Sequence, residues 1–323
     1  MPDLTPYVTR EQMAEVVRQT FTGAAEGKIA NFSGQLWALK GRIEAGDLLV
    51  MPMKTTKQIA FGRVTGHYQY RHNEEDKTKR HVVPVDWKRT DLPRTAVKQD
   101  LLFSLGSAMS IFAPSKNNAV ARLEYLLTHG TDPGQVPSLG GSPPKPGPTV
   151  LVDEAEDVDE PEITTDIEQV AYDQITARIA EEFAGHGLAT LITELLTAEG
   201  FICFQSPPGP DGGIDIVAGK GPLGLDTPRL LVQVKSGSQI GSPVVTQLHG
   251  VMTTHGADQG LLVAWGGLSK PARDALKTHQ LRVRVWEASD VVDAVLRSYE
   301  RLSEDVRSKL SLKRVWMLTD AGF

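Results

Sequence analysis

Two short apolar segments separated by a glycine- and proline-rich stretch constrain the fold of this chain most strongly. Residues 214–218 and 230–234 are largely apolar runs of strand length, and Gly219–Gly224 between them is rich in turn-forming residues. Short apolar runs bounded in this way are typical of buried β-strands. We therefore predict that this part of the chain folds back on itself as a β-hairpin.

The predicted hairpin gathers three polar side chains. Gln233 and Lys235 lie two residues apart on the second strand and so point to the same face, while Asp215 comes at the start of the first strand. Carboxylate and amide oxygens suit Mg²⁺, for which Mn²⁺ can substitute. An ammonium group can orient an attacking water beside a phosphodiester. We predict all three as catalytic residues, with Asp215 and Gln233 as the metal ligands.

The same residues also have ordinary structural explanations. An aspartate beside two glycines often forms a turn, and a lysine at the end of a strand is often only solvated. Gln233 is harder to explain in this way, because a polar side chain within a buried strand is costly without a partner. The pattern alone leaves a metal site and a structural turn open.

The run Asp211-Gly-Gly-Ile-Asp215, followed by Val232-Gln-Val-Lys235, resembles the catalytic signature of Mrr-type restriction endonucleases. These enzymes are a branch of the PD-(D/E)XK nuclease superfamily in which glutamine takes the third acid position. The resemblance covers about residues 186–300, because the segments around the motif also match in order. It implies a Mg²⁺-dependent endonuclease that hydrolyses double-stranded DNA. Gln247, on the helix after the motif, is a further candidate for active-site or DNA contact.

One position departs from the pattern of this family. The family commonly carries a glutamate on the helix before the first strand, and the corresponding residue here is Ala189. Glu194 lies five residues further on, which is about 140° around a helix, so it is predicted to face elsewhere. Asp211 is a possible additional acid; otherwise water and phosphate oxygens complete the metal coordination.

The composition is that of a globular protein long enough for two domains, with 323 residues of which 40% are hydrophobic. Cys203 is the only cysteine, which excludes an intrachain disulfide and argues against a cysteine zinc site; its apolar neighbours predict a packing role. No signal peptide and no apolar segment of membrane-spanning length is visible. A cytoplasmic protein without a membrane partner is therefore expected.

Residues 131–164 have the composition of a linker, rich in proline and glycine at first and acidic afterwards. Nine carboxylates and no lysine or arginine lie between residues 150 and 168, and removing nine negative charges from the net charge of −6 leaves +3. The remainder is thus mildly basic and compatible with a DNA-binding face. A solvated tether is the simple interpretation, and an acidic mimic of nucleic acid is the alternative.

The segment 165–323 is predicted as the nuclease domain, with its C-terminal helix and tail. Helical spacing and capping residues predict helices at 165–183, 188–196, 269–278 and 290–302, and apolar runs predict strands at 260–265 and 283–286. Added to the hairpin, this order predicts an α/β (α+β) domain with a mixed sheet flanked by helices.

The segment 1–130 is predicted as a second domain. Its pattern indicates helices at 11–19, 100–112 and 119–127, and strands at 47–53, 59–70 and 81–87. Two of these runs, Gly46–Val50 and Ala60–Tyr70, resemble the PUA-like barrel and its EVE-type members over about residues 28–112. The resemblance implies a small β-barrel that recognises a modified base or a nucleotide.

Reading a flipped base requires flat aromatic rings and a few hydrogen-bonding groups. The candidates for such a site are Asn31, Ser33, Trp37, Tyr68 and Tyr70. Trp37 is preferred because it is expected near a turn at Ser33, whereas Trp87 is expected in the core of the barrel. A solvated hairpin loop is the default interpretation of the charged run that holds Lys77, Lys79 and Arg80, and these three cations are the candidates for phosphate contacts.

These observations predict a restriction-type DNA endonuclease that depends on base modification. One site cuts one strand, so double-strand cleavage implies a homodimer or a higher homo-oligomer. Two alternatives remain: a defence effector whose DNA degradation is activated by a nucleotide signal, and a non-catalytic binder of modified nucleic acid. The alanine at position 189 keeps the second alternative open.

Overall fold

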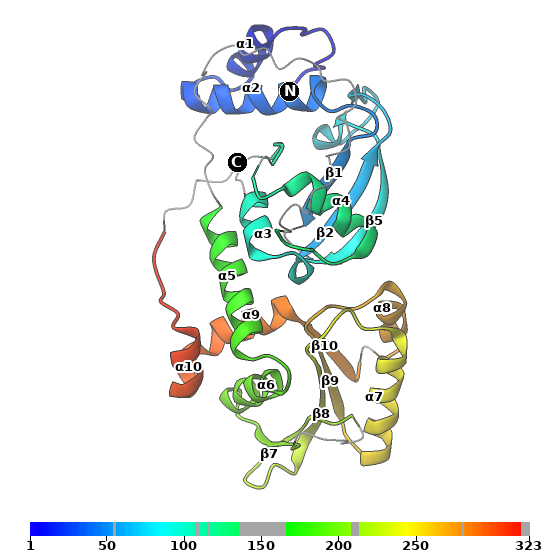
Figure 1. Ribbon diagram of the computed structural model, residues 1–323, viewed down its shortest axis with the longest axis vertical. Helices are drawn as coiled ribbons and strands as arrows, with labels where there is room; N and C mark the ends of the chain where they lie inside the picture. The colour runs from blue at the N-terminus through cyan, green and yellow to red at the C-terminus, as the bar shows by residue number, and fades with distance from the viewer. Residues whose placement is uncertain are drawn as a thin grey trace. The chain divides into compact units, whose positions relative to one another are not determined.

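The structure is a computed structural model that describes residues 1–53, 56–106, 110–114, 116–135, 166–207, 213–279 and 281–317. The chain divides into two compact units, Met1–Val170 and Ala171–Phe323 (Figure 1). Residues 136–164 of the predicted linker lie outside the described residues. Within the described ranges, no helix is long and apolar enough to cross a membrane.

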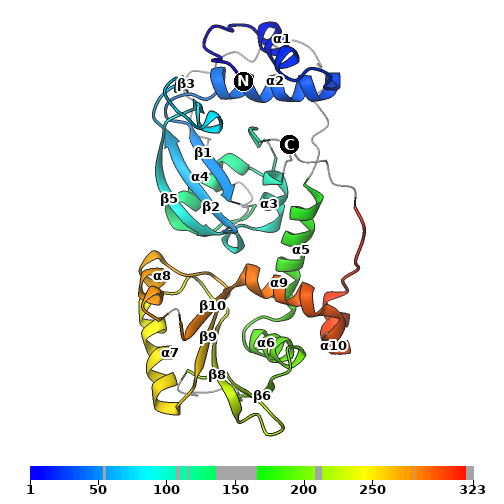
Figure 2. The ribbon, with the colours of Figure 1, turned by 180° about the vertical axis from the view of Figure 1, so that it is seen from behind.

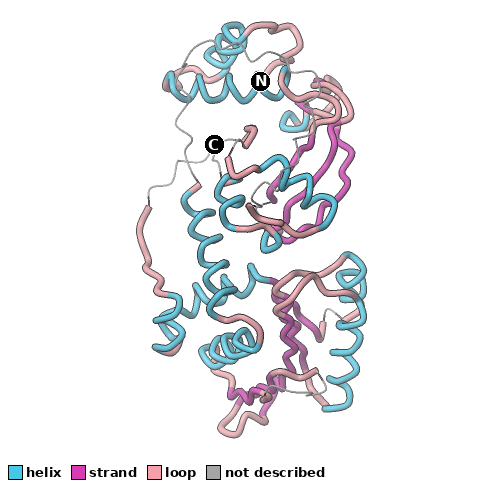
Figure 3. The backbone as a smooth tube through the Cα atoms, viewed as in Figure 1, coloured by secondary structure: helices cyan, strands magenta, loops and turns pink. Residues whose placement is uncertain are grey.

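The N-terminal unit combines helices with two small antiparallel sheets (Figure 3). Its helices are α1 (Arg10–Thr20), α2 (Glu26–Gly41), α3 (Gln99–Leu105) and α4 (Ala119–His129). Its strands are β1 (Leu48–Met53), β2 (Gln58–Val64), β3 (Gln69–Tyr70), β4 (His81–Val82) and β5 (Val85–Pro93). One sheet has the order β1-β2-β5, and the other pairs β3 with β4.

The predicted barrel is not closed in the described part of the unit. The strand expected over 59–70 ends at Val64, and the one expected over 81–87 is divided after Val82. Pro84 lies in the second break and has no N–H to donate to a neighbouring strand, although its carbonyl accepts from Thr65. The chain therefore forms an open three-stranded sheet and a separate two-stranded pair.

Helix α2 is one element that the sequence pattern failed to predict. It covers residues expected to form a turn around Ser33. Its apolar residues do not form one stripe along the helix. Ile29 is the one residue of this helix that is buried. By contrast, α1 was predicted almost to its ends, and a capping box between Thr9 and Gln12 begins it.

Helices α3 and α4 pack with the three-stranded sheet around a core that includes Phe61, Leu101 and Leu126. Arg122 of α4 is 2% exposed and makes paired hydrogen bonds to two carboxylates. Its Nε and Nη2 donate to Asp132 at 2.8 and 2.6 Å, and its Nη1 and Nη2 donate to Asp100 at 2.7 and 2.9 Å. This ion-pair network joins α3, α4 and the segment after α4.

The C-terminal unit is built on a five-stranded mixed sheet, as predicted. Its helices are α5 (Ile167–Glu182, which begins just before the unit boundary), α6 (His186–Ala198), α7 (Ser242–His255), α8 (Lys270–Lys277), α9 (Ala288–Ser298) and α10 (Glu304–Leu310). Its strands are β6 (Ile202–Gln205), β7 (Ile216–Lys220), β8 (Asp226–Lys235), β9 (Gln259–Ala264) and β10 (Val283–Glu287). The order is β10-β9-β8-β7-β6; β6, β7 and β8 are antiparallel neighbours, while β8, β9 and β10 are parallel.

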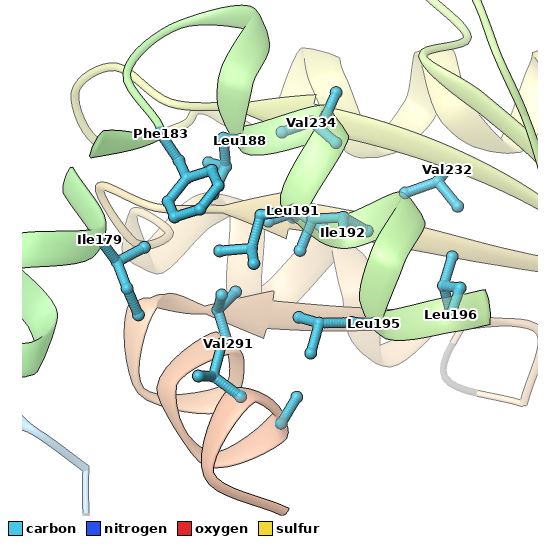
Figure 4. Packing of buried hydrophobic residues seen from close by; sticks show 14 of the residues in the cluster. Ile179, Phe183, Leu188, Leu191, Ile192, Leu195, Leu196, Val232, Val234 and Val291 are labelled. Carbon is cyan, nitrogen blue, oxygen red and sulfur yellow. The ribbon is translucent and has the colours of Figure 1, made fainter. Parts of the chain in front are cut away.

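Helices cover both faces of this sheet. Helices α6 and α9 lie on one side and α7 and α8 on the other (Figure 2). Figure 4 shows the larger core, where Leu191, Leu195 and Val232 are among the packed side chains. Cys203 packs at the edge of this core, and partial burial raises the pKa of its thiol.

Candidate active site

The β7–β8 hairpin brings Asp215 against β8, close to Gln233 and Lys235. Asp215 lies immediately before β7, and its N–H donates to the carbonyl of Val232 at 2.9 Å. Its Oδ2 accepts from the N–H of Val234 at 2.8 Å. One carboxylate oxygen is thus held by the backbone of β8 at the residue between the predicted glutamine and lysine.

Gln233 lies on the face of β8 opposite the large core. Its neighbours Val232 and Val234 pack into that core, whereas Gln233 is 1% exposed and points the other way, as the alternation of the strand predicts. Its Oε1 has no hydrogen-bond partner among the described residues. An unsatisfied buried acceptor costs about 1–3 kcal/mol, so this position calls for a donor or a cation.

Lys235 ends β8 beside an open hollow of about 420 Å³. The hollow is lined by consecutive residues from Val234 to Gly241. Lys235 is half-buried, and no described carboxylate lies within ion-pair distance of its ammonium group. Its charge is therefore available to a group that enters the hollow.

The loop that lines the hollow is fixed by backbone hydrogen bonds. Ile240 donates to the carbonyl of Gly267 at 2.9 Å, and Ser269 donates back to Ile240 at 2.9 Å. A Cβ on Gly266 would lie 2.3 Å from the carbonyl oxygen of Gly237, so only glycine permits this close approach. This loop was not predicted as part of the site, although Gly266 and Gly267 after β9 were a visible sign of a close backbone approach.

Gly213 positions the two site glutamines and was also missed as a functional residue. It adopts a φ of +89°, in the region that favours glycine. A Cβ there would lie 2.9 Å from Gln233 Nε2 and 3.1 Å from Gln247 Nε2. The amide of Gln247 on α7 is thus brought to the same place as Gln233.

We expect Gly213→Ala to lower DNA cleavage by at least about tenfold, because the added methyl group displaces both amides and strains the backbone. Steady-state cleavage of a plasmid measures this. The control is Gly250→Ala on α7, where a Cβ meets nothing within 4 Å. Equal activity of both variants and the parent would show that the position of these amides does not matter.

The residues present suit a hard divalent cation. The side-chain oxygens are the second carboxylate oxygen of Asp215 and the unsatisfied oxygen of Gln233. Mg²⁺ prefers oxygen ligands and keeps several waters, so two protein oxygens are compatible with it. Across the described ranges, no group of three or more His, Cys, Asp or Glu side chains could hold a metal. Asp211, the possible additional acid, lies outside those ranges.

The helix before the hairpin supplies no carboxylate here. Ala189 is buried in the large core, so the position where the family commonly has glutamate is apolar. Glu194 faces away, as predicted, and its Oε2 accepts from the N–H of Ser303 at 3.3 Å. Asp215 therefore supplies the carboxylate that bonds the backbone of β8 between Gln233 and Lys235.

Three of the predicted base-recognition residues lie on α2 rather than at a turn. Asn31 accepts from Gln35 within the helix, and Ser33 Oγ donates to the carbonyl of Ala30 at 3.0 Å. Trp37 packs against the cluster formed by Leu4, Met13 and Val16. The reason for preferring Trp37, an expected turn at Ser33, was therefore wrong.

Tyr68 and Tyr70 share a cluster with two histidines. Tyr68 Oη lies 2.9 Å from His81 Nδ1 and accepts from the N–H of Leu4 at 3.2 Å. Tyr70 meets the edges of His72 and His81, with ring centroids 4.8 and 5.0 Å apart. Burial raises the pKa of Tyr68 and lowers the pKa of His81. The two tyrosines lie together, while Trp87, expected in the core, is 39% exposed.

The predicted phosphate-binding cations surround a short 3₁₀ turn, Lys77–Lys79. Lys79 pairs with Asp76 at 3.0 Å, and Arg80 Nε donates to the carbonyl of Glu74 at 2.8 Å. Lys77 is exposed. Among the described contacts, none joins Lys77, Lys79 or Arg80 to Trp37, which packs beside Leu4, Met13 and Val16.

Comparisons with known proteins distinguish the two units. Residues 180–295 match a family model described as restriction endonuclease, so this part of the chain is similar to restriction endonucleases. Residues 2–107 match a model described as a domain of unknown function (DUF8426), which does not confirm the PUA-like resemblance. A comparison with curated proteins found no match.

Two solved structures are similar to this chain. The MspJI restriction endonuclease in complex with a 27-mer oligonucleotide is 15% identical; the similarity covers 79% of this chain and 58% of that one, with a TM-score of 0.33. The DNA modification-dependent restriction endonuclease AspBHI is 16% identical; the similarity covers 82% and 60%, with a TM-score of 0.32. This chain thus spans about three fifths of the length of each.

Proposed function

We propose that the chain is a Mg²⁺-dependent DNA endonuclease whose active site comprises Asp215, Gln233 and Lys235. The match of residues 180–295 to restriction endonucleases supports the reaction class. The observation that carries the site is the buried, unsatisfied oxygen of Gln233, next to a carboxylate that the backbone of β8 holds in place. A structural turn does not explain why that glutamine is buried without a partner.

Asp215 and Gln233 would hold the cation. When bound, Mg²⁺ stabilises negative charge on a phosphate and lowers the pKa of a bound water. Lys235 donates hydrogen bonds to the attacking water or to a phosphate oxygen at the mouth of the hollow, and its charge offsets that of the phosphate. Gln247 helps to position Gln233, because the side-chain amides of both residues lie beside Gly213.

The N-terminal unit would provide recognition of modified DNA in this proposal. Tyr68 and Tyr70 supply adjacent rings, and His81 holds the hydroxyl of Tyr68 in place through its Nδ1. The decisive test compares plasmids that differ only in base modification, with Mg²⁺ or Mn²⁺. Cleavage of the modified plasmid alone supports the proposal. Cleavage that needs an added nucleotide favours a defence effector that a nucleotide signal activates. DNA binding without cleavage in the presence of either metal ion favours a non-catalytic binder of modified nucleic acid.

We expect Lys235→Ala to lower the cleavage rate by about 100-fold or more, because the cation next to the reacting phosphate is lost. DNA binding, measured by a filter or mobility assay, should change by less than about tenfold, since many other contacts contribute to affinity. The matched control is Lys270→Ala, which removes an exposed lysine at the start of α8. Equal cleavage by both variants would contradict the role of Lys235.

A further inference from the structure

Ser206, the residue after β6, holds the backbone on both sides of the Asp215 α-carbon. Its N–H donates to the carbonyl of Asp215 at 2.8 Å, and its Oγ donates to the carbonyl of Ile214 at 2.7 Å. Pro207 comes next and has no N–H to donate. The hydroxyl of Ser206 therefore supplies the second hydrogen bond at the place where the backbone of β6 can donate no further.

These two hydrogen bonds coincide with a break in strand alternation just before β7. In a regular strand, residues two apart share a face, and consecutive carbonyls point to opposite neighbouring strands. Here Ile214 packs in the core beneath α7 and α8, whereas Ile216 packs in the large core beneath α6 and α9. The consecutive carbonyls of Ile214 and Asp215 both accept from Ser206. The chain is therefore twisted at Asp215.

The twist turns the side chain of Asp215 toward the backbone of β8. Backbone N–H groups lie in the plane of a sheet, and Asp215 Oδ2 accepts from the N–H of Val234 at 2.8 Å. The carboxylate is thus held between the two faces of the sheet, beside the residue that separates Gln233 from Lys235. With regular alternation, the side chain of Asp215 would project from one face of the sheet and away from this N–H.

We propose that Ser206 is a positioning residue, which holds the twist that aims the carboxylate of Asp215 at the cation. This inference rests on the proposed function, in which Asp215 is a metal ligand. Ser206 acts through Asp215 and not on the cation or the DNA, because its hydroxyl proton is already donated to the carbonyl of Ile214. Loss of a residue that orients a metal ligand typically lowers metal affinity or activity about 10- to 100-fold.

The test compares Ser206→Thr with Ser206→Val, two side chains of similar shape of which only threonine carries a hydroxyl. The Mg²⁺ concentration for half-maximal DNA cleavage should rise about tenfold or more in the valine variant, because the carbonyl of Ile214 loses its donor and the twist relaxes. In the threonine variant it should stay within about threefold of the parent. A serine with only a structural role would change the melting temperature and leave the Mg²⁺ requirement of the folded protein unchanged.

The matched control is Ser308→Val on α10. The hydroxyl of Ser308 also donates to a backbone carbonyl, that of Asp305, at 2.8 Å. The substitution removes a hydrogen bond of the same kind without touching Asp215, so the Mg²⁺ requirement should equal that of the parent. Melting temperatures measured without metal show which variants fold, and Ser206→Ala, which adds no bulk, replaces the valine variant if that one is unfolded.

The outcomes separate this inference from the proposed function. A valine variant with the Mg²⁺ requirement of the parent, or a threonine variant as impaired as the valine variant, overturns the inference while the role of Asp215 stands. If the parent cuts no DNA, the proposed function fails, and Mn²⁺ binding measured by calorimetry decides the inference. Weaker binding in the valine variant than in the parent and the threonine variant then supports it. A parent that binds neither Mg²⁺ nor Mn²⁺ overturns both.

Discussion

Replacing Asp215 with asparagine is expected to lower the rate of DNA cleavage by at least about 1,000-fold. Asparagine has nearly the same shape, and its amide oxygen can still accept the hydrogen bond from the N–H of Val234. The hairpin should therefore keep its geometry, while the charge that attracts a divalent cation is lost. Cleavage kinetics over a series of Mg²⁺ concentrations measure the effect, and a separate titration of Mg²⁺ binding should show weaker affinity.

A second substitution at the same position separates charge from structure. Asp215→Ala removes the acceptor as well, so the buried N–H of Val234 loses its partner. The free energy of unfolding should then be about 1–3 kcal/mol lower than in the asparagine variant. Asp274→Asn, at an exposed carboxylate on α8 paired with Lys277, serves as the control for a change of charge. An asparagine variant at 215 that cuts DNA like the parent would exclude Asp215 as a metal ligand.

Replacing Arg122 with alanine is expected to destabilise the N-terminal unit by about 3–5 kcal/mol, since it leaves buried carboxylate without a counter-charge. Asp132 is fully buried and also accepts from the N–H groups of Lys98 and Gly134, so it cannot turn toward solvent. Thermal or urea unfolding followed by circular dichroism measures the loss. A change below about 1 kcal/mol would show that these ion pairs are exposed to solvent and contribute little to stability.

The control is Arg63→Ala in the same unit. Arg63 pairs with Glu124, but both side chains are more than a third exposed, so a loss of about 1 kcal/mol or less in the free energy of unfolding is expected.

Acid should weaken the Arg122 network in the parent. Hydrogen bonds from Arg122 lower the pKa of Asp100, so the stability that this carboxylate contributes is present above its ordinary pKa and is lost as the pH falls through its folded pKa.

Local patterns predicted the elements of the C-terminal unit well. The spacing of apolar residues predicted α6, and the Gly/Pro turn predicted the β7–β8 hairpin. Strand alternation alone decides that Gln233 faces away from Val232 and Val234, because the period of two does not depend on what the strand packs against. The face of β8 on which the predicted site residues lie therefore follows from strand alternation alone.

The N-terminal unit shows where local patterns fail. Helix α2 lacks a clear apolar stripe, so its helical state is stabilised by packing of Leu36 and Trp37 against the α1 cluster, which no local window contains. The open sheet is another case. Hydrophobic alternation identifies strands but says nothing about whether the last strand meets the first, and closure depends on contacts distant in sequence.

Local sequence patterns were enough to predict most strands and helices around the motif, the face that Gln233 and Lys235 share, and the missing acid at Ala189. They could not predict that β8 pairs in parallel with β9, that Asp215 is tied to the backbone of β8, or that Gly213 lies against the amides of both Gln233 and Gln247. The difference lies in the sequence separation over which each interaction acts. Alternation and capping act within a few residues, whereas strand partners and buried polar contacts join residues that meet only when the whole domain is packed.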